Sequence, residues 1–273
     1  MLFFTQKGKC FWMRVFEIPE GSKNSKGRAI QNLINIEQDD RVKAFICTQD
    51  LKDEEYVNNH YVIMATKMGQ VKKTSLEQYS RPRSNGINAI TVKDGDELLE
   101  AKLTNGNSQI MLAVKSGKAI RFEEGKTRPM GRNASGVRGI RLKDKKDEVV
   151  GMISVNDMDA NILVVSENGY GKRSSLEDYR LTNRGGKGVK TISITEKTGK
   201  LVTLKSVSDS DDLMIINKSG IAIRMQVEDL RVMGRATQGV KVISIKDGDS
   251  IAAVAKVMNC LLYTSDAADD SGC

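Results

Sequence analysis

A pair of glycine signatures recurs five times along this chain of 273 residues. The first glycine ends a short turn before an apolar and basic stretch, as in VKSGKAIR, and stands at Gly8, Gly69, Gly117, Gly169 and Gly220. The second opens an alternating stretch, as in SGVRGIRL, and stands at Gly27, Gly86, Gly136, Gly188 and Gly239. Successive first glycines are 48 to 61 residues apart. Such a period indicates an array of structural repeats, at the propeller end of the known range.

Within each repeat the apolar residues have the period of a strand rather than a helix. In the third repeat, four short apolar stretches between residues 110 and 155 are separated by turns. All three prolines (Pro19, Pro82 and Pro129) fall in the loop between the two predicted hairpins, where no central-strand amide is needed. No convincing amphipathic helix is found. We therefore predict an all-β, propeller-like domain of four-stranded blades.

The predicted domain covers residues 1–258 without a Pro/Ser-rich linker. The long first interval between repeats is explained by an acidic insertion, DLKDEEYVNNH, at residues 50–60. Residues 259–273 have neither the apolar alternation of a strand nor the basic character of the repeats. We therefore interpret them as a foreign, artefactual tail without a function. The repeats are expected at about 1–58, 59–107, 108–158, 159–209 and 210–258.

Composition favours a cytoplasmic protein. The chain begins directly with a predicted strand and not with a signal peptide, and no apolar run approaches the ~18 residues of a membrane span. The four cysteines have no paired spacing, as expected in a reducing compartment. His60 is the only histidine, so neither a zinc site nor a Ser-His pair is expected, and we predict no metal site and no catalytic residue.

The formal net charge of +8 understates how regularly the basic residues are placed. Lys or Arg recurs four residues before the second glycine, two residues after it, and four residues after the first glycine. A charge repeated at one blade position forms a ring, and a polyanion with regularly spaced phosphates follows such a ring. Exposed hairpin ends kept soluble by Lys and Arg are the plainer interpretation, but acidic residues would serve that purpose equally well. We predict phosphate contacts at Lys23, Arg28, Lys72, Lys73, Arg81, Arg83, Arg121, Arg132, Arg138, Lys172, Arg173, Arg184, Lys187, Lys190, Arg224, Arg235 and Lys241.

Motifs for other functions are absent from the sequence. MGRNASG has the glycine spacing of a phosphate-binding loop, but Val137 and Arg138 stand where Lys and Ser or Thr are required. Aromatic residues make up 5% of the chain, too few for the stacking platforms that bind single-stranded nucleic acid.

The repeats resemble the C-terminal domain of DNA gyrase A, above all in NRGGKGVKTISITEKTGKLV at 183–202, NKSGIAIR at 217–224 and RVMGRATQGV at 231–240. The resemblance implies a six-bladed β-pinwheel in which neighbouring blades exchange strands. It also implies that duplex DNA wraps around a basic rim to support ATP-driven negative supercoiling by the holoenzyme, a type IIA topoisomerase. ATP, magnesium, the rest of gyrase A and the gyrase B protein would belong to that holoenzyme heterotetramer, since this sequence has neither a catalytic tyrosine motif nor an ATP site.

Two departures from the family pattern are visible. With five repeats instead of six, the chain is expected to lack the first blade, and residues 1–4 are expected to form an unpaired sheet edge. The family's signature box, QRRGGKG, belongs to that first blade. Here RGGKG, comprising Arg184, Gly185, Gly186, Lys187 and Gly188, is a box-like echo in the fourth repeat present. Two alternatives stay open, namely the equivalent domain of the topoisomerase IV A protein and a propeller scaffold that binds acidic protein partners.

Overall fold

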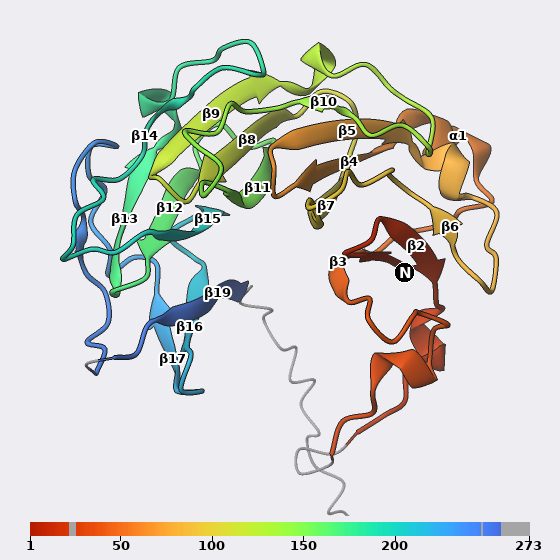
Figure 1. The fold of residues 1–273 in the computed structure, drawn as a ribbon, viewed down its shortest axis with the longest axis horizontal. Helices are drawn as coiled ribbons and strands as arrows, with labels where there is room; N and C mark the ends of the chain where they lie inside the picture. The colour runs from red at the N-terminus through yellow and green to blue at the C-terminus, as the bar shows by residue number, and fades with distance from the viewer. Residues whose placement is uncertain (22–25, 247, 258–273) are drawn as a thin grey trace, which may run out of the picture.

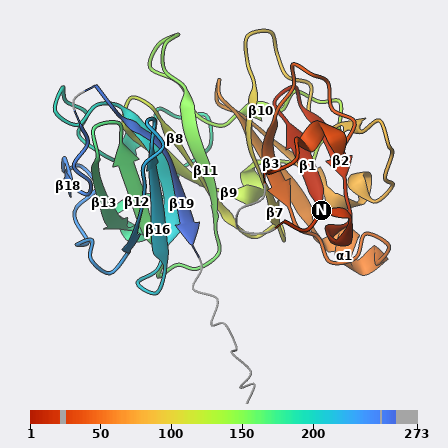
Figure 2. The same cartoon turned by 90° about the horizontal axis from the view of Figure 1, so that it is seen from below.

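The computed structural model describes residues 1–21, 26–246 and 248–257. Five small antiparallel sheets follow one another along an arc, which Figure 1 shows from the N-terminal repeat to the C-terminal one. In the view turned by 90°, the strands of successive sheets run across the thickness of the arc (Figure 2). The prediction of an all-β, five-bladed propeller arrangement is confirmed.

The strands of each repeat have the following bounds. The first repeat forms β1 (Leu2–Thr5), β2 (Lys9–Trp12) and β3 (Val42–Ile46). The second forms β4 (Tyr61–Thr66), β5 (Gln70–Ser75), β6 (Ile87–Asn88) and β7 (Leu98–Thr104). The third forms β8 (Gln109–Val114), β9 (Lys118–Glu123), β10 (Val137–Arg138) and β11 (Val149–Val155). The fourth forms β12 (Asn161–Ser166), β13 (Tyr170–Ser175), β14 (Val189–Lys190) and β15 (Leu201–Val207). The fifth forms β16 (Asp212–Asn217), β17 (Ala222–Gln226), β18 (Val240–Lys241) and β19 (Ile251–Val257).

Each four-stranded sheet borrows its outermost strand from the next repeat. The short strands β6, β10, β14 and β18 pair antiparallel with β2, β5, β9 and β13 of the preceding repeat. The strand exchange implied by the family resemblance is therefore present. The fifth sheet, β17-β16-β19, receives no such strand from the described residues and has three strands, so the prediction of four-stranded blades holds for four sheets.

The first repeat corrects two expectations. Strand β1 lies between β2 and β3, so residues 1–4 are not an unpaired edge. The stretch after Gly27, expected to open a strand, instead forms a 3-10 helix, Ile30–Asn32, and a loop. Its Ile34 and Ile36 pack with Phe3 and Phe11 of the first sheet. The segment thus covers its own sheet.

The hydrophobic core is divided into clusters that neighbouring repeats share. Along β4, β8 and β12, successive side chains enter different clusters, so these strands are buried on both faces. Met111, for example, packs toward the fourth repeat and Leu112 toward the second. Burial on both faces explains why the sequence runs are continuously apolar instead of alternating.

Helical structure is limited to short segments. The acidic insertion forms one α-helix that the sequence analysis did not predict, α1 (Glu54–Asn59). Asp53 caps it by accepting a hydrogen bond from the Tyr56 amide at 3.1 Å, and Val57 joins the first core cluster. The remaining 3-10 helices are Val15–Glu17, Leu76–Tyr79, Glu124–Lys126 and Leu176–Asp178.

Candidate nucleic-acid interface

The exchanged strands carry cations at the same position. Strands β6, β10 and β14 lie on the outer side of the arc, whereas β7, β11 and β15 lie on its inner side (Figure 1). The second residue of β10, β14 and β18 is Arg138, Lys190 and Lys241, and all three side chains are exposed. These predicted phosphate contacts are therefore placed where an external polyanion has access to them.

Glycine makes the exchange of these strands possible. Gly136 has φ +84° and sits so close to the preceding repeat that an added Cβ would lie 2.5 Å from the carbonyl oxygen of Val71. Gly188, with φ +70°, is equally close to the carbonyl oxygen of Ala119, and Gly239 repeats the arrangement. A side chain at these positions would meet both a forbidden backbone conformation and a backbone clash. The second glycine of the last four signatures thus marks a junction between blades, whereas Gly27 of the first signature meets nothing within 4 Å.

The basic position four residues after the first glycine has a structural role in most repeats. Lys73 is 4% exposed, and its Nζ lies 2.8 Å from Oε1 of the fully buried Glu124 in the next repeat. Arg173 is 7% exposed and bonds to Asp209 and to the carbonyl oxygen of Leu230 in the following repeat. The expectation that these two cations lie on an exposed ring is wrong, because the neighbouring repeat encloses them.

Arg121 and Trp12 occupy this same position in the third and first repeats. The half-buried Arg121 donates from Nη1 to the carbonyl oxygens of Leu176 and Tyr179 at 2.9 and 3.0 Å. The indole Nε1 of Trp12 donates to the carbonyl oxygen of Tyr79 at 2.8 Å. A neutral ring and a guanidinium thus satisfy equivalent carbonyl oxygens, which indicates that the position serves contact between blades.

Lys72 and Lys172 are fully buried, which also contradicts their prediction as exposed phosphate contacts. The Nζ of Lys72 donates to the carbonyl oxygens of Ala89 and Arg132, at 2.5 and 2.6 Å. That of Lys172 donates to the carbonyl oxygen of Gly234 at 2.6 Å. Burial lowers the pKa of Lys72 to about 7 and that of Lys172 to about 8. Both ammonium groups hold the next repeat's loop instead of facing solvent.

These buried lysines predict a pH-dependent stability. Between about pH 7 and pH 9.5 the unfolded lysines keep their protons while the folded ones lose theirs, so the unfolded state binds more protons and the folded state gains stability as the pH rises. We expect the free energy of unfolding of the wild type to gain about 2 kcal/mol relative to a Lys72→Met, Lys172→Met variant over this range. Urea unfolding at several pH values measures this, and a difference that stays constant with pH would contradict it.

The arginines four residues before the second glycine are half-buried, not exposed as predicted. The Nη1 of Arg184 donates to the carbonyl oxygen of Arg138 at 3.1 Å, and that of Arg235 to the carbonyl oxygen of Lys190 at 2.9 Å. Each arginine therefore braces the preceding outer strand at the residue whose side chain points outward. Arg132 is half-buried at the equivalent place in the third repeat.

The other predicted contacts are distributed around the arc. Lys23 lies outside the described residues. Arg224 is exposed and bonds through Nε to Oδ2 of Asp212 at 2.7 Å. The remaining four are exposed: Arg28, Arg81, Arg83 and Lys187.

The box-like segment 184–188 forms the loop that leads into β14. Gly185 donates from its amide to the carbonyl oxygen of Gly139 at 2.6 Å, and Gly186 accepts from the amide of Arg141 at 2.8 Å. The loop borders a cavity of about 400 Å³ whose cationic lining is Arg121, Arg141, Arg180 and Lys187. The segment thus joins two outer loops, and Gly186, Lys187 and Gly188 form part of the wall of a basic hollow.

Three exposed arginines in this region were missed by the sequence analysis. Arg128, Arg180 and Arg231 each precede a residue that forms an isolated parallel bridge with the preceding repeat. They stand 11 residues after Gly117, Gly169 and Gly220, and the predicted Arg81 stands 12 residues after Gly69. Arg128, Arg180 and Arg231 also stand 8 residues before Gly136, Gly188 and Gly239, so the phase is visible from either glycine.

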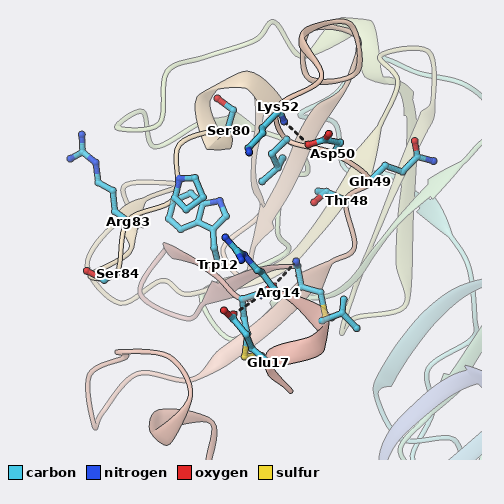
Figure 3. A pocket seen from close by; sticks show the side chains of 15 residues that line it. Trp12, Arg14, Glu17, Thr48, Gln49, Asp50, Lys52, Ser80, Arg83 and Ser84 are labelled. Atoms are coloured by element: carbon cyan, nitrogen blue, oxygen red, sulfur yellow. Dashed lines mark hydrogen bonds between the residues drawn. The ribbon is translucent and has the colours of Figure 1, made fainter. Parts of the chain in front are cut away.

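Another cavity, of about 620 Å³, lies beside the first repeat and has a lining of mixed charge. Figure 3 shows Trp12, Arg14 and Glu17 facing a loop that carries Asp50 and Lys52. Its lining mixes the cations Arg14, Lys52 and Arg83 with the carboxylates of Glu17 and Asp50. The carboxylates accept from the backbone amides of Arg14 at 2.9 Å and of Lys52 at 2.8 Å. It therefore offers no concentrated charge to a ligand.

The described residues contain no group of three or more His, Cys, Asp or Glu side chains placed to hold a metal ion. Within that same part of the chain, no helix is long and apolar enough to cross a membrane.

Comparison with known proteins agrees with the repeat pattern. A family model described as the DNA gyrase C-terminal domain, a β-propeller, matches residues 1–49, 60–105, 109–156, 160–208 and 211–258. The interruption between the first two matched segments coincides with the α1 insertion.

Individual relatives support the same assignment. The DNA gyrase A protein of Staphylococcus epidermidis (strain ATCC 12228) is 43% identical over 258 residues, covering 94% of this chain and 28% of that protein. The chain therefore spans little more than a quarter of the length of this relative. The C-terminal domain of DNA topoisomerase IV superposes with a TM-score of 0.84 at 26% identity, covering 94% of this chain and 78% of the other. That of DNA gyrase A superposes with a TM-score of 0.80 at 25% identity, covering 94% and 82%. The chain belongs to the family of the DNA gyrase C-terminal β-propeller domain.

Proposed function

We propose that this protein binds duplex DNA along the outer strands of the arc and bends the duplex around it. The observation that carries the proposal is the repetition of an outward cation at one position of three successive exchanged strands, as Arg138, Lys190 and Lys241. Exposed arginines in the adjoining loops, including Arg180 and Arg231, add charge at a second recurring position. A curved row of cations suits a phosphate backbone better than a single acidic ligand.

Phosphate neutralisation supplies the energy for bending. Smooth bending of 20 to 30 base pairs costs on the order of 1 to 6 kcal/mol. Each phosphate contact releases counterions, so the logarithm of the affinity falls with the logarithm of salt by about 0.9 per contact. Contacts of this kind hold the duplex without identifying its bases.

Within the longer protein to which such a domain belongs, the bent duplex would present a crossing segment to the cleavage core of gyrase A. The activity supported would be negative supercoiling together with the gyrase B protein in the cytoplasm. ATP and magnesium would bind outside this domain. Among the alternatives, the high identity to gyrase A favours gyrase over topoisomerase IV. A scaffold for acidic proteins is separated from both by DNA length, since only bending requires a duplex of many tens of base pairs.

Binding is expected to be insensitive to sequence and steeply dependent on salt. Affinities for two unrelated duplexes of equal length, measured by fluorescence anisotropy from low to moderate salt, should agree within about threefold and fall along a common slope. A short duplex serves as the control for length. A marked preference for one sequence, or an affinity that ignores salt, would contradict the proposal.

A further inference from the structure

The junction between the third and fourth repeats concentrates positive charge more than the other junctions do. In the register of β9 and β14, Lys118 stands directly opposite Lys190. Like charges directly opposite one another destabilise a sheet. The equivalent pairs at the other three junctions join a cation to a neutral residue: Lys9 with Asn88, Gln70 with Arg138, and Tyr170 with Lys241.

Further lysines surround this pair. A cavity of about 520 Å³ is lined by both members and by Lys115, Lys143, Lys146 and Lys200. Within the part of the chain that the structure describes, ion pairing accounts for only one of the six ammonium groups, that of Lys115, which lies 3.1 Å from Glu148. The other five have no ion-pair partner there, so the six lysines outnumber the two carboxylates of the lining, Asp144 and Asp147.

The two carboxylates that line this hollow are already engaged. Asp147 is 8% exposed and accepts hydrogen bonds from the amide and hydroxyl of Ser116 at 2.9 and 2.8 Å, and from the amide of Lys143 at 3.1 Å. Asp144 accepts from the amide of Lys146 at 2.8 Å. These hydrogen bonds fix the loop that carries Lys143 and Lys146, and they leave both carboxylates negatively charged, so the lining has six lysines against two carboxylates.

A second cationic hollow adjoins the first along the same pair of strands. The cavity beside the box-like loop is lined by Ala119 and Val189, whereas the lysine-rich cavity is lined by their neighbours Lys118 and Lys190. Arg121, Arg141, Arg180 and Lys187 supply the charge of this second hollow. The exchanged strand β14 thus runs between two basic depressions.

We propose that the junction between the third and fourth repeats is the principal phosphate clamp of the arc, where the backbone of duplex DNA is held most tightly. The inference rests on the proposed function and adds to it an unequal division of affinity among the junctions. The occupant is duplex DNA because the outward cations of the neighbouring junctions, Arg138 and Lys241, continue the same row on either side. Repulsion between Lys118 and Lys190 lowers the stability of the free protein, and a phosphate bound over the pair reduces this repulsion.

The test compares two variants that each remove two charges from outer positions. The variant Lys118→Gln, Lys190→Gln removes the cross-strand pair of one junction, and the variant Arg138→Gln, Lys241→Gln removes one cation from each neighbouring junction. By anisotropy with a duplex of several tens of base pairs, we expect the first variant to lose affinity by at least about tenfold more than the second. In the absence of DNA, Lys118→Gln should raise the melting temperature, whereas Arg138→Gln should not, because only Lys118 faces a like charge.

The possible outcomes separate this inference from the proposed function. Equal losses in the two variants would overturn the clamp and leave DNA binding by the arc intact. Failure of the wild type to bind the duplex would overturn both. Sodium tripolyphosphate is the probe for a free polyanion. If it raises the melting temperature of the wild type but not of Lys118→Gln, Lys190→Gln, while both bind duplex equally, the hollow is a site for small polyphosphates and the inference is wrong.

Discussion

Replacing Arg138, Lys190 and Lys241 together with glutamate is expected to lower the affinity for duplex DNA by more than about 100-fold at moderate salt. Each change removes one phosphate contact and places a repelling charge at the outermost point of a blade. The three side chains are exposed, so the sheets should keep their stability. Anisotropy with a long duplex measures the loss, and thermal unfolding measures the fold.

A matched control changes the same net charge elsewhere. Arg41 directly precedes β3, Lys102 lies on β7 and Lys256 lies on β19. Strands β3 and β7 form the sheet edges opposite the exchanged strands, and β19 forms an edge of the fifth sheet. Glutamate at these three positions should reduce the affinity for DNA by less than about tenfold, because it changes the net charge of the protein without removing a phosphate contact. If both triple variants lose affinity equally, net charge rather than the outer row binds the DNA.

Substitution of Gly169 by alanine is expected to destabilise the protein far more than the same substitution at Gly220. Both glycines end the first turn of a repeat, with φ of +78° and +87°. An added Cβ at Gly169 would lie 2.5 Å from the carbonyl oxygen of Ile243 in the next repeat, whereas at Gly220 it would meet nothing within 4 Å. The conformational cost of about 1 to 2 kcal/mol is common to both. The clash raises the cost at Gly169 to about 4 kcal/mol.

Urea unfolding followed by circular dichroism distinguishes the two variants. The matched pair isolates contact between repeats from backbone conformation, since only the neighbour differs. Equal losses of unfolding free energy would show that the first glycine serves its own turn alone. The assignment of this glycine to the junction between blades would then be wrong.

The fold could be predicted from the repeat signature because most of its glycines lie at contacts between neighbouring blades. Gly136, for example, approaches the backbone of Val71, whereas Gly27 and Gly220 meet nothing within 4 Å. The sequence does not show which strand each exchanged strand pairs with. A paired segment of two residues, such as β14, is too short to have a hydrophobic period. The first repeat departs from the rule because residues 30–36 cover their own sheet, a choice that depends on what lies beside the sheet and not on the segment itself.

The candidate site could be predicted only in part. Arg138, Lys190 and Lys241 are exposed, as charge phase predicted, and their contact with phosphate stays a prediction; charge phase also treated the buried Lys73 and Arg173 as exposed. Lys72 is buried because carbonyl oxygens from later in the chain enclose its ammonium group, which sequence spacing cannot show. One sequence signal did exist: Ile120 holds the place of Lys72 in the third repeat, so the position suits a buried side chain.

The most direct test of the central claim is the linking number of closed circular DNA. A relaxed plasmid is incubated with the wild-type protein and a nicking-closing enzyme, and the products are separated by gel electrophoresis. If the arc bends and wraps the duplex, the linking number should shift in one direction and increase with the ratio of protein to DNA, and the triple glutamate variant of the outer strands should give no shift. Binding by the wild type that leaves the linking number unchanged would contradict wrapping.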